Sequence, residues 1–237
     1  MRRWLLGALL LGCAPAVLPG SADLRLKEAM AAPGADIGAL LAQDAEVHVS
    51  GETVKGREAG AARLSALEAG GPTELFRHHE FSWLSLGDGR GLLLQRGEDD
   101  RLTRVVELPA PQSGDGTPWQ AVYYSRAWNE DDDALRLQQL KPVWPVDGRY
   151  VDATNDWTGP QGVSEMIGRF RKLVPGTQVK ATTGLADAGG GWMTWDWVIL
   201  VRPGASRPLF FGFDVMHLDA EGKIELLVGF VNGRRGP

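Results

Sequence analysis

The chain has 237 residues, which is enough for one large domain or for two domains of the commonest size. With 43% hydrophobic and 23% charged residues, its composition is that of a soluble globular protein, and this excludes a disordered chain. The formal net charge of −5 makes nucleic acid an unsuitable partner, because the phosphate backbone is itself anionic.

The first residues have the pattern of an export signal. Arg2 and Arg3 form a positively charged start, residues 4–11 are apolar, and no acidic residue precedes Asp23. This apolar stretch is much shorter than the roughly 20 residues that a helix needs to cross a bilayer. We therefore expect an exported protein without a transmembrane span.

The only cysteine directly follows this apolar stretch. Cys13 comes after Leu10, Leu11 and Gly12, which matches the bacterial lipobox pattern. The match predicts a signal peptide over 1–12, a lipid on Cys13, a tether over 13–22, and a place in the cell envelope where the lipid anchor alone reaches the membrane. A buried structural thiol, and ordinary cleavage after residue 16 or 22, are the alternatives. A single cysteine also allows no intramolecular disulfide.

Two stretches that lie 103 residues apart match each other in spacing. Residues 44–67 and 147–170 align without a gap, with Asp44 matching Asp147 and Gly56 matching Gly159. A fixed-period match of this kind indicates a tandem repeat. It predicts a first domain over 23–128 with a degenerate site, a linker over 129–133, and a second domain over 134–233.

Both copies show helical patterns first and strand patterns after them. In the first copy we expect helices at 23–30, 36–41 and 59–67 and strands at 46–50, 81–86, 91–96, 102–108 and 119–124. In the second copy we expect helices at 134–139 and 161–172 and strands at 149–153, 179–183, 192–201, 208–218 and 223–231. The acidic run 130–133 suits the first turn of a helix. This order predicts an α+β fold, a curved antiparallel sheet with helices packed on one side.

The strands of the second copy are apolar on both faces. In residues 208–218, Phe210, Met216 and Leu218 alternate with Phe213 and Val215. Because neither face suits water, we expect the two copies to pack sheet against sheet as a covalent pseudo-dimer.

Two segments of the second copy resemble a known family. Residues 212–230, GFDVMHLDAEGKIELLVGF, are similar to the last two strands of SnoaL-like polyketide cyclases and ketosteroid isomerases, which belong to the nuclear transport factor two superfamily. Residues 147–159, DGRYVDATNDWTG, resemble the first strand and the entry to the third helix of these proteins. The resemblance implies two tandem cone-shaped domains, in each of which N-terminal helices and a bent sheet enclose an apolar pocket. Because this fold carries many activities, the site must decide the function.

The resemblance also implies a pair of catalytic carboxylates. Asp152 stands where ketosteroid isomerases have their general base, and Asp214 stands where they have a protonated aspartate that donates to the developing oxyanion. That family has a tyrosine on its first helix as a further donor, and residues 134–140 contain none. Tyr150 shares a strand face with Asp152 and is a candidate to reach the pocket. The alternative is structural, with Asp214 bonded to a backbone or tryptophan N–H and Asp152 capping a turn.

We expect Tyr150, Trp157, Asp196, Phe210 and Met216 to line the ligand pocket. No metal site is expected, because histidines and cysteines do not occur in pairs at ligand spacing. No cofactor is expected either, because the chain has no phosphate-binding glycine loop and no Gly-x-Ser-x-Gly motif.

These patterns leave two main functions open. One is binding of a small apolar molecule in the second domain, combined with cofactor-free proton transfer next to a carbonyl, as in isomerases, cyclases and dehydratases. The other is a ligand carrier or assembly module of the cell envelope without chemistry. The sequence alone does not choose between an enzyme and a binding protein.

Overall fold

The computed structural model describes residues 21–32, 34–67, 71–110, 119–183 and 185–231. The predicted signal peptide, Cys13 and nearly all of the tether lie outside these residues. Within them, no helix is long and apolar enough to cross a membrane.

The described residues form two units of mixed α and β structure. The first contains α2 (Ala22–Ala31), η1 (Gly38–Leu40), α3 (Arg57–Ser65), β1 (Leu41–Val49), β2 (Glu52–Lys55), β3 (Pro72–His78), β4 (Phe81–Leu86), β5 (Gly91–Arg96) and β6 (Leu102–Leu108). The second contains α4 (Trp119–Trp128), α5 (Asp133–Leu140), α6 (Gly159–Leu173), β7 (Arg149–Val151), β8 (Asp156–Thr158), β9 (Gln178–Ala181), β10 (Ala186–Gly189), β11 (Trp192–Leu200), β12 (Pro208–Leu218) and β13 (Ile224–Val231).

The two sheets share one topology. Their strand orders are β2-β1-β6-β5-β4-β3 and β8-β7-β13-β12-β11-β10, and β9 also pairs with β11. Neighbouring strands are antiparallel except for the parallel pairs β1–β6 and β7–β13. The two units are therefore copies of one α+β fold, as the repeat predicted.

The repeat is visible down to single hydrogen bonds. Gly56 N donates to Ala45 O at 2.8 Å, and Gly159 N donates to Gly148 O at 2.8 Å. The donor and the acceptor of the second bond each lie 103 residues after those of the first. Both Gly56 and Gly159 have a positive φ, of 95° and 71°, which glycine adopts without strain. The glycines that define the sequence repeat thus form the same turn into a helix in both units.

Helix α4 departs most from the sequence prediction. A strand was expected at 119–124 and the first domain was expected to end at residue 128, but Trp119–Trp128 is a helix. Its buried residues, Gln120, Ala121, Tyr124 and Ala127, follow the helical period, although the run of valine and aromatic residues favours a strand locally. Tyr124 and Ala127 belong to the core of the second unit. The predicted boundary between 128 and 129 is therefore wrong, and the second unit includes α4.

Smaller departures concern short or exposed elements. The predicted helix 36–41 is only the 3-10 turn η1 followed by β1, and Ser21 and Ala22, assigned to the tether, are buried in the first unit. Strands β2, β3, β8 and β10 were not predicted. β2 and β8 expose most of their side chains, so no alternation of apolar residues marks them.

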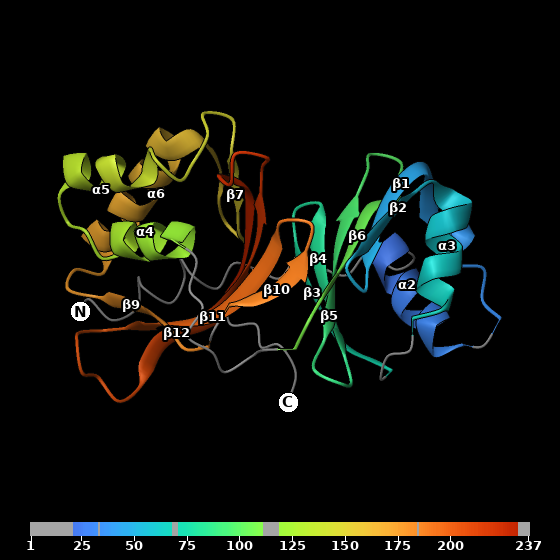
Figure 1. Ribbon diagram of the computed structural model, residues 1–237. Coiled ribbons are helices and arrows are strands. Elements are labelled where there is room, and N and C mark those ends of the chain that lie inside the picture. Colours follow the sequence, from blue (N-terminus) through green and yellow to red (C-terminus); the bar gives the residue numbers. More distant parts are fainter. Residues whose placement is uncertain (1–20, 33, 68–70, 111–118, 184, 232–237) are drawn as a thin grey trace.

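The sheets of the two units pack against each other. Figure 1 shows the sheets meeting in the middle, with α2 and α3 outside one sheet and α4, α5 and α6 outside the other. One buried cluster spans both sheets: Phe81, Trp83, Leu93, Val106 and Leu108 from the first unit, and Val151, Trp192, Phe213, Val215, Leu226, Val228 and Phe230 from the second. The other face of the second sheet, with Met216, packs under the helices. The interpretation that this contact imitates a two-fold contact of single-copy relatives stays a prediction.

The strand registers identify what the first unit has in place of Asp214. Leu92 pairs with Glu107 in the first sheet as Asp214 pairs with Gly229 in the second. Leu92 is fully buried together with Leu84, in a core packed with leucines. The first unit therefore has an apolar core where the second has an acidic group.

Candidate functional site

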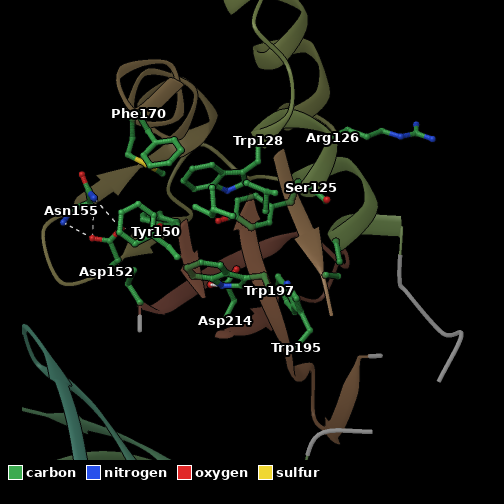
Figure 2. A pocket seen from close by; sticks show the side chains of 18 of the residues that line it. Ser125, Arg126, Trp128, Tyr150, Asp152, Asn155, Phe170, Trp195, Trp197 and Asp214 are labelled. Carbon is green, nitrogen blue, oxygen red and sulfur yellow. Dashed lines mark hydrogen bonds between the residues drawn. The ribbon is translucent and has the colours of Figure 1, made fainter. Parts of the chain in front are cut away.

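A large cavity lies between the helices and the sheet of the second unit. Its volume is about 560 Å³, within the range typical of small-molecule sites. Figure 2 shows aromatic side chains from α4, α6 and the sheet converging around it. Eight aromatic residues line it: Tyr124, Trp128, Tyr150, Trp157, Phe170, Trp195, Trp197 and Phe210. Asp152 and Asp214 are its two acidic lining residues within the described chain.

The two carboxylates lie close together because the residue between them, Gly229, has no side chain. Asp214 on β12 pairs with Gly229 on β13, and Asp152 directly follows β7, the next strand of the sheet. A Cβ atom on Gly229 would lie 3.2 Å from Asp214 Oδ1, 3.4 Å from the Tyr150 hydroxyl and 3.6 Å from Asp152 Cβ. A Cβ atom at Gly229 would therefore press against Asp214 Oδ1 and would lie in contact with Tyr150 and Asp152.

Asp214 is a buried acid that keeps its proton at neutral pH. Its side chain is 4% exposed, and Trp197 Nε1 donates to its Oδ1 at 2.8 Å. Burial raises the pKa of Asp214 to about 8, and the nearby charges of Asp152 and Asp196 act in the same direction. The neutral carboxyl can donate a hydrogen bond into the cavity.

Asp152 is held by a complete set of neutral hydrogen-bond donors. The Tyr150 hydroxyl donates to Oδ2 at 2.9 Å, and Thr154 N and Asn155 N both donate to Oδ1 at 2.8 Å. The Thr154 hydroxyl and the Asn155 side-chain amide complete the set. A carboxyl that only accepts hydrogen bonds is the ionised form. Because its lone pairs are occupied, a substrate could give a proton to Asp152 only after one of these bonds breaks.

A second tyrosine lines the cavity from helix α4. Tyr124 on α4 is buried at the cavity, and its ring packs edge-on against Trp128. Burial raises the pKa of Tyr124 well above its usual value, so it stays a neutral donor. Residues 134–140 could not supply the tyrosine of related proteins because the first helix of this unit is α4.

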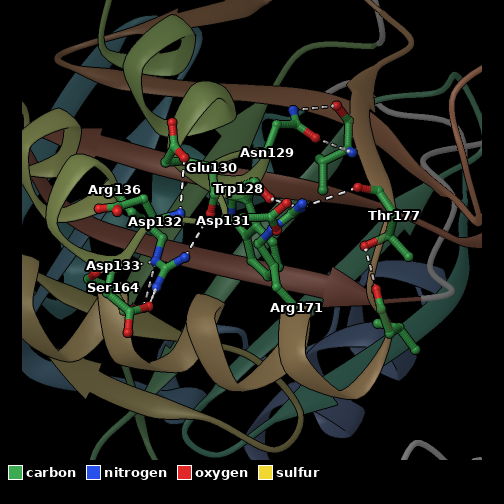
Figure 3. Close-up of polar contacts among 12 residues, drawn as sticks. Trp128, Asn129, Glu130, Asp131, Asp132, Asp133, Arg136, Ser164, Arg171 and Thr177 are labelled. Carbon is green, nitrogen blue, oxygen red and sulfur yellow. Dashed lines mark hydrogen bonds and ion pairs between the residues drawn. The ribbon is translucent and has the colours of Figure 1, made fainter.

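An acidic loop fixes α4 in its position over the cavity. Figure 3 shows residues 130–133 enclosed by two arginines from α5 and α6. Arg171 Nε donates to Asp131 Oδ1 at 2.6 Å, and its Nη1 donates to Trp128 O at 2.8 Å. Asp132 caps α5 through Ala134 N and Leu135 N, which confirms the predicted helix start. Arg136 bonds Glu130 O and pairs with Asp133. These contacts join the end of α4, and so the Trp128 ring, to α6.

The predicted pocket residues divide into two groups. Tyr150, Trp157 and Phe210 line the cavity, and their contact with a ligand stays a prediction. Asp196 does not, because it pairs with Phe213 on the sheet face that meets the first unit. Met216 shares the face of Asp214 but is fully buried in the core and does not reach the cavity. The cavity residues on α4 and α6, among them Trp128 and Phe170, were missed. Part of α4 was predicted to be a strand of the first domain, and no sequence pattern shows how α6 packs across the sheet.

The histidines lie away from the cavity. His48 bonds Thr53 and Ala188 O, and His217 bonds Glu225, so both have structural partners. His78 is buried beside Phe230, and neither ring nitrogen has a hydrogen-bond partner among the described residues. No group of three or more potential metal ligands occurs within the described ranges.

Comparison with solved structures places this fold. A SnoaL-like family protein from Agrobacterium tumefaciens strain C58 is 32% identical, over 48% of this chain and 95% of its own, with a TM-score of 0.44. A protein with a ketosteroid isomerase-like fold from Catenulispora acidiphila DSM 44928, crystallised with trimethylamine, is 19% identical over 48% and 85%, with a TM-score of 0.39. An NTF2-like protein from Exiguobacterium sp. 255-15 is 15% identical over 48% and 99%, with a TM-score of 0.40.

The solved structures that resemble the chain are thus SnoaL-like, ketosteroid isomerase-like and NTF2-like proteins. Each comparison covers about half of this chain, which agrees with two such units in tandem. The trimethylamine belongs to the Catenulispora protein. No protein-family profile matches the chain, and no curated protein matches it.

Proposed function

We propose that this chain is an exported lipoprotein that binds a small, mostly apolar molecule in the cavity of its second unit. The observation that carries the proposal is the cavity itself, about 560 Å³ of space lined by eight aromatic side chains with two carboxylates at one place. The structural reading of Asp152 as a turn cap is compatible with this role, since an anchored carboxylate still gives the cavity a fixed polar corner. The lipid anchor rests on the pattern around Cys13.

A residue that fills the cavity should abolish binding. Ala121 is buried on α4 and lines the cavity, so Ala121→Phe would place a ring inside it. We expect the purified protein to bind 2-naphthol, with a change in tryptophan fluorescence, and Ala121→Phe to lose that binding by at least tenfold. The matched control is Ala134→Phe on the exposed face of α5, which should bind like the wild type. Unchanged binding in folded Ala121→Phe would rule out the cavity as the binding site.

Proton transfer next to a carbonyl is the second candidate function. It is favoured by the convergence of a protonated Asp214 and an ionised Asp152 on one apolar cavity. In this reaction Asp152 would take a proton from the carbon beside a ketone and return it to another carbon, while Asp214 donates a hydrogen bond to the enolate oxygen. Because the oxygens of Asp152 already accept from five donor groups, Asp152 is poorly placed to take a proton, and ligand binding is therefore the first candidate function.

Isomerisation of 3-cyclohexenone to its conjugated isomer, followed by ultraviolet absorbance, tests the chemistry. If the protein is active, Asp152→Asn is expected to slow turnover at least 100-fold, because amide groups do not accept the proton. Binding of 2-naphthol should stay within about threefold, which separates the base from the binding site. Equal activity in wild type and Asp152→Asn would exclude Asp152 as the base. If the wild type shows no activity, ligand binding remains the proposed function.

A further inference from the structure

The cavity of the second unit carries an uncompensated negative charge. All groups that donate to Asp152 are neutral: one tyrosine hydroxyl, one threonine hydroxyl, an asparagine amide and two backbone N–H groups. No lysine, arginine or histidine of the described chain lies within 4.0 Å of Asp152 or Asp214 as an ion-pair partner. These hydrogen bonds offset the desolvation of the Asp152 carboxylate, but because the donors are neutral they leave its net charge in the cavity.

The walls around this charge are suited to a cation. Eight aromatic side chains line the cavity, four of them tryptophans. The face of an aromatic ring attracts a cation through its quadrupole, and tryptophan does so most strongly. Figure 2 shows Trp128, Tyr150, Trp195 and Trp197 turned toward the same space as Asp152 and Asp214. Aromatic faces and a carboxylate therefore act on a cation from different sides of one enclosure.

The cations that the chain itself brings to the cavity lie at its exterior. Arg126 and Arg169 are the lining residues with positive charge in the described chain, and both are exposed. Figure 2 shows Arg126 extending away from the aromatic walls. The guanidinium of Arg169 lies over Trp157, 4.9 Å from the ring centroid. Their charges are screened by solvent and do not neutralise the interior.

The hydrogen-bond inventory restricts the kind of cation further. A primary ammonium group carries three N–H donors that need acceptors. The oxygens of Asp152 already accept from five donor groups, and Asp214 Oδ1 accepts from Trp197 Nε1, so the two carboxyls offer few free acceptors. A quaternary ammonium has no N–H to satisfy and needs only the electrostatic field and the ring faces. This inventory favours an alkylated ammonium over a primary one.

We propose that the ligand of the second unit is an organic cation, an apolar molecule with a quaternary ammonium group that lies among the aromatic rings beside Asp152. The proposal rests on the proposed binding function and adds the charge of the ligand to it. It predicts discrimination between two molecules of the same shape that differ only in charge.

Two isosteric probes make the test. Benzyltrimethylammonium and neopentylbenzene differ only in a central nitrogen or carbon atom, and both fit a cavity of this volume. Binding of each to the purified protein is measured by tryptophan fluorescence, in the wild type and in Asp152→Asn. We expect Asp152→Asn to weaken the cation at least tenfold and to change the neutral probe by less than about twofold, because only the cation loses a charge interaction.

Two further variants guard against a folding artefact. Trp128→Leu keeps an apolar wall but removes a ring, so it should weaken the cation more than the neutral probe. Asp187→Asn removes the charge of an exposed side chain on β10, outside the cavity, and should leave the affinities for both probes within about twofold. Benzylammonium should bind the wild type more weakly than benzyltrimethylammonium.

The outcomes separate the two proposals. If the neutral probe binds and the cation binds no better in wild type than in Asp152→Asn and Trp128→Leu, the cation proposal is overturned while the binding function stands. If neither probe nor 2-naphthol binds the folded wild type, the binding function fails and the cation proposal fails with it. Selective loss of the cation in both variants supports the proposal.

Discussion

Asp214→Asn is expected to make the protein more stable at neutral pH, by up to about 4 kcal/mol at pH 7. Burial raises the pKa of Asp214 from 3.8 to about 8. Between these values the unfolded chain releases a proton that the folded protein keeps, so stability is lost as the pH rises through this range. Asparagine does not ionise in either state, and its oxygen can still accept the hydrogen bond from Trp197.

Urea denaturation of wild type and Asp214→Asn between pH 3.5 and 8.5 measures this effect. The difference in unfolding free energy should be small at pH 3.5, which lies below the aspartate pKa in both states, and should grow toward pH 8. A constant difference over the whole range would show that Asp214 is ionised in the folded protein. A carboxylic acid that lowers stability at neutral pH is typical of a functional site rather than of a core.

The second large effect concerns His78, which the first unit contributes to the contact between the sheets. Burial lowers the pKa of His78 from 6.5 to about 4, and the charge of Asp152 only partly opposes this. Stability from the neutral ring is complete above pH 6.5 and is lost as the pH falls to about 4, because the unfolded chain takes up the proton first. We expect a loss of about 3 kcal/mol from this group.

His78→Phe should remove this acid sensitivity, because phenylalanine fills the same place beside Phe230 without a titrating group. Unfolding free energies of the wild type and the variant should be close at pH 7.5 and should diverge toward pH 4, with the variant more stable. The matched control is His79→Asn. His79 is exposed and has a φ of 52°, which asparagine tolerates, so its replacement should leave the acid profile unchanged. If the unfolding free energies of the wild type and His78→Phe change with pH in the same way, the pKa of His78 is not lowered in the folded protein.

Much of the fold follows from patterns that a single strand or helix carries. Strands β4, β5, β6 and β12 were predicted with the bounds that the structure shows, because each is a continuous or alternating apolar run between turn residues. Short strands such as β2 and β8 are exposed and become strands only because a neighbouring strand pairs with them. Their partners lie outside any local window.

The candidate site was predictable only in part. Asp152, Asp214, Tyr150, Trp157 and Phe210 could be selected because strand parity and the family motif place them on one face. Asp196 was assigned wrongly, since its place in the sequence between two tryptophans does not tell which face of the sheet its side chain occupies. The residues of α4 carry no motif, and their role depends on how a helix packs across the sheet.

The sequence by itself determined that the chain is a tandem repeat and that its fold is α+β. It also determined that the second copy carries the acidic pair Asp152 and Asp214, which the first copy lacks. These conclusions depend on spacing and residue type, which are local properties. Only the tertiary structure decided that α4 belongs to the second unit, that Asp152 is saturated with neutral donors, and that an aromatic cavity surrounds both acids. Those features arise from contacts between residues distant in the chain, whose energies depend on burial and geometry that no local pattern encodes.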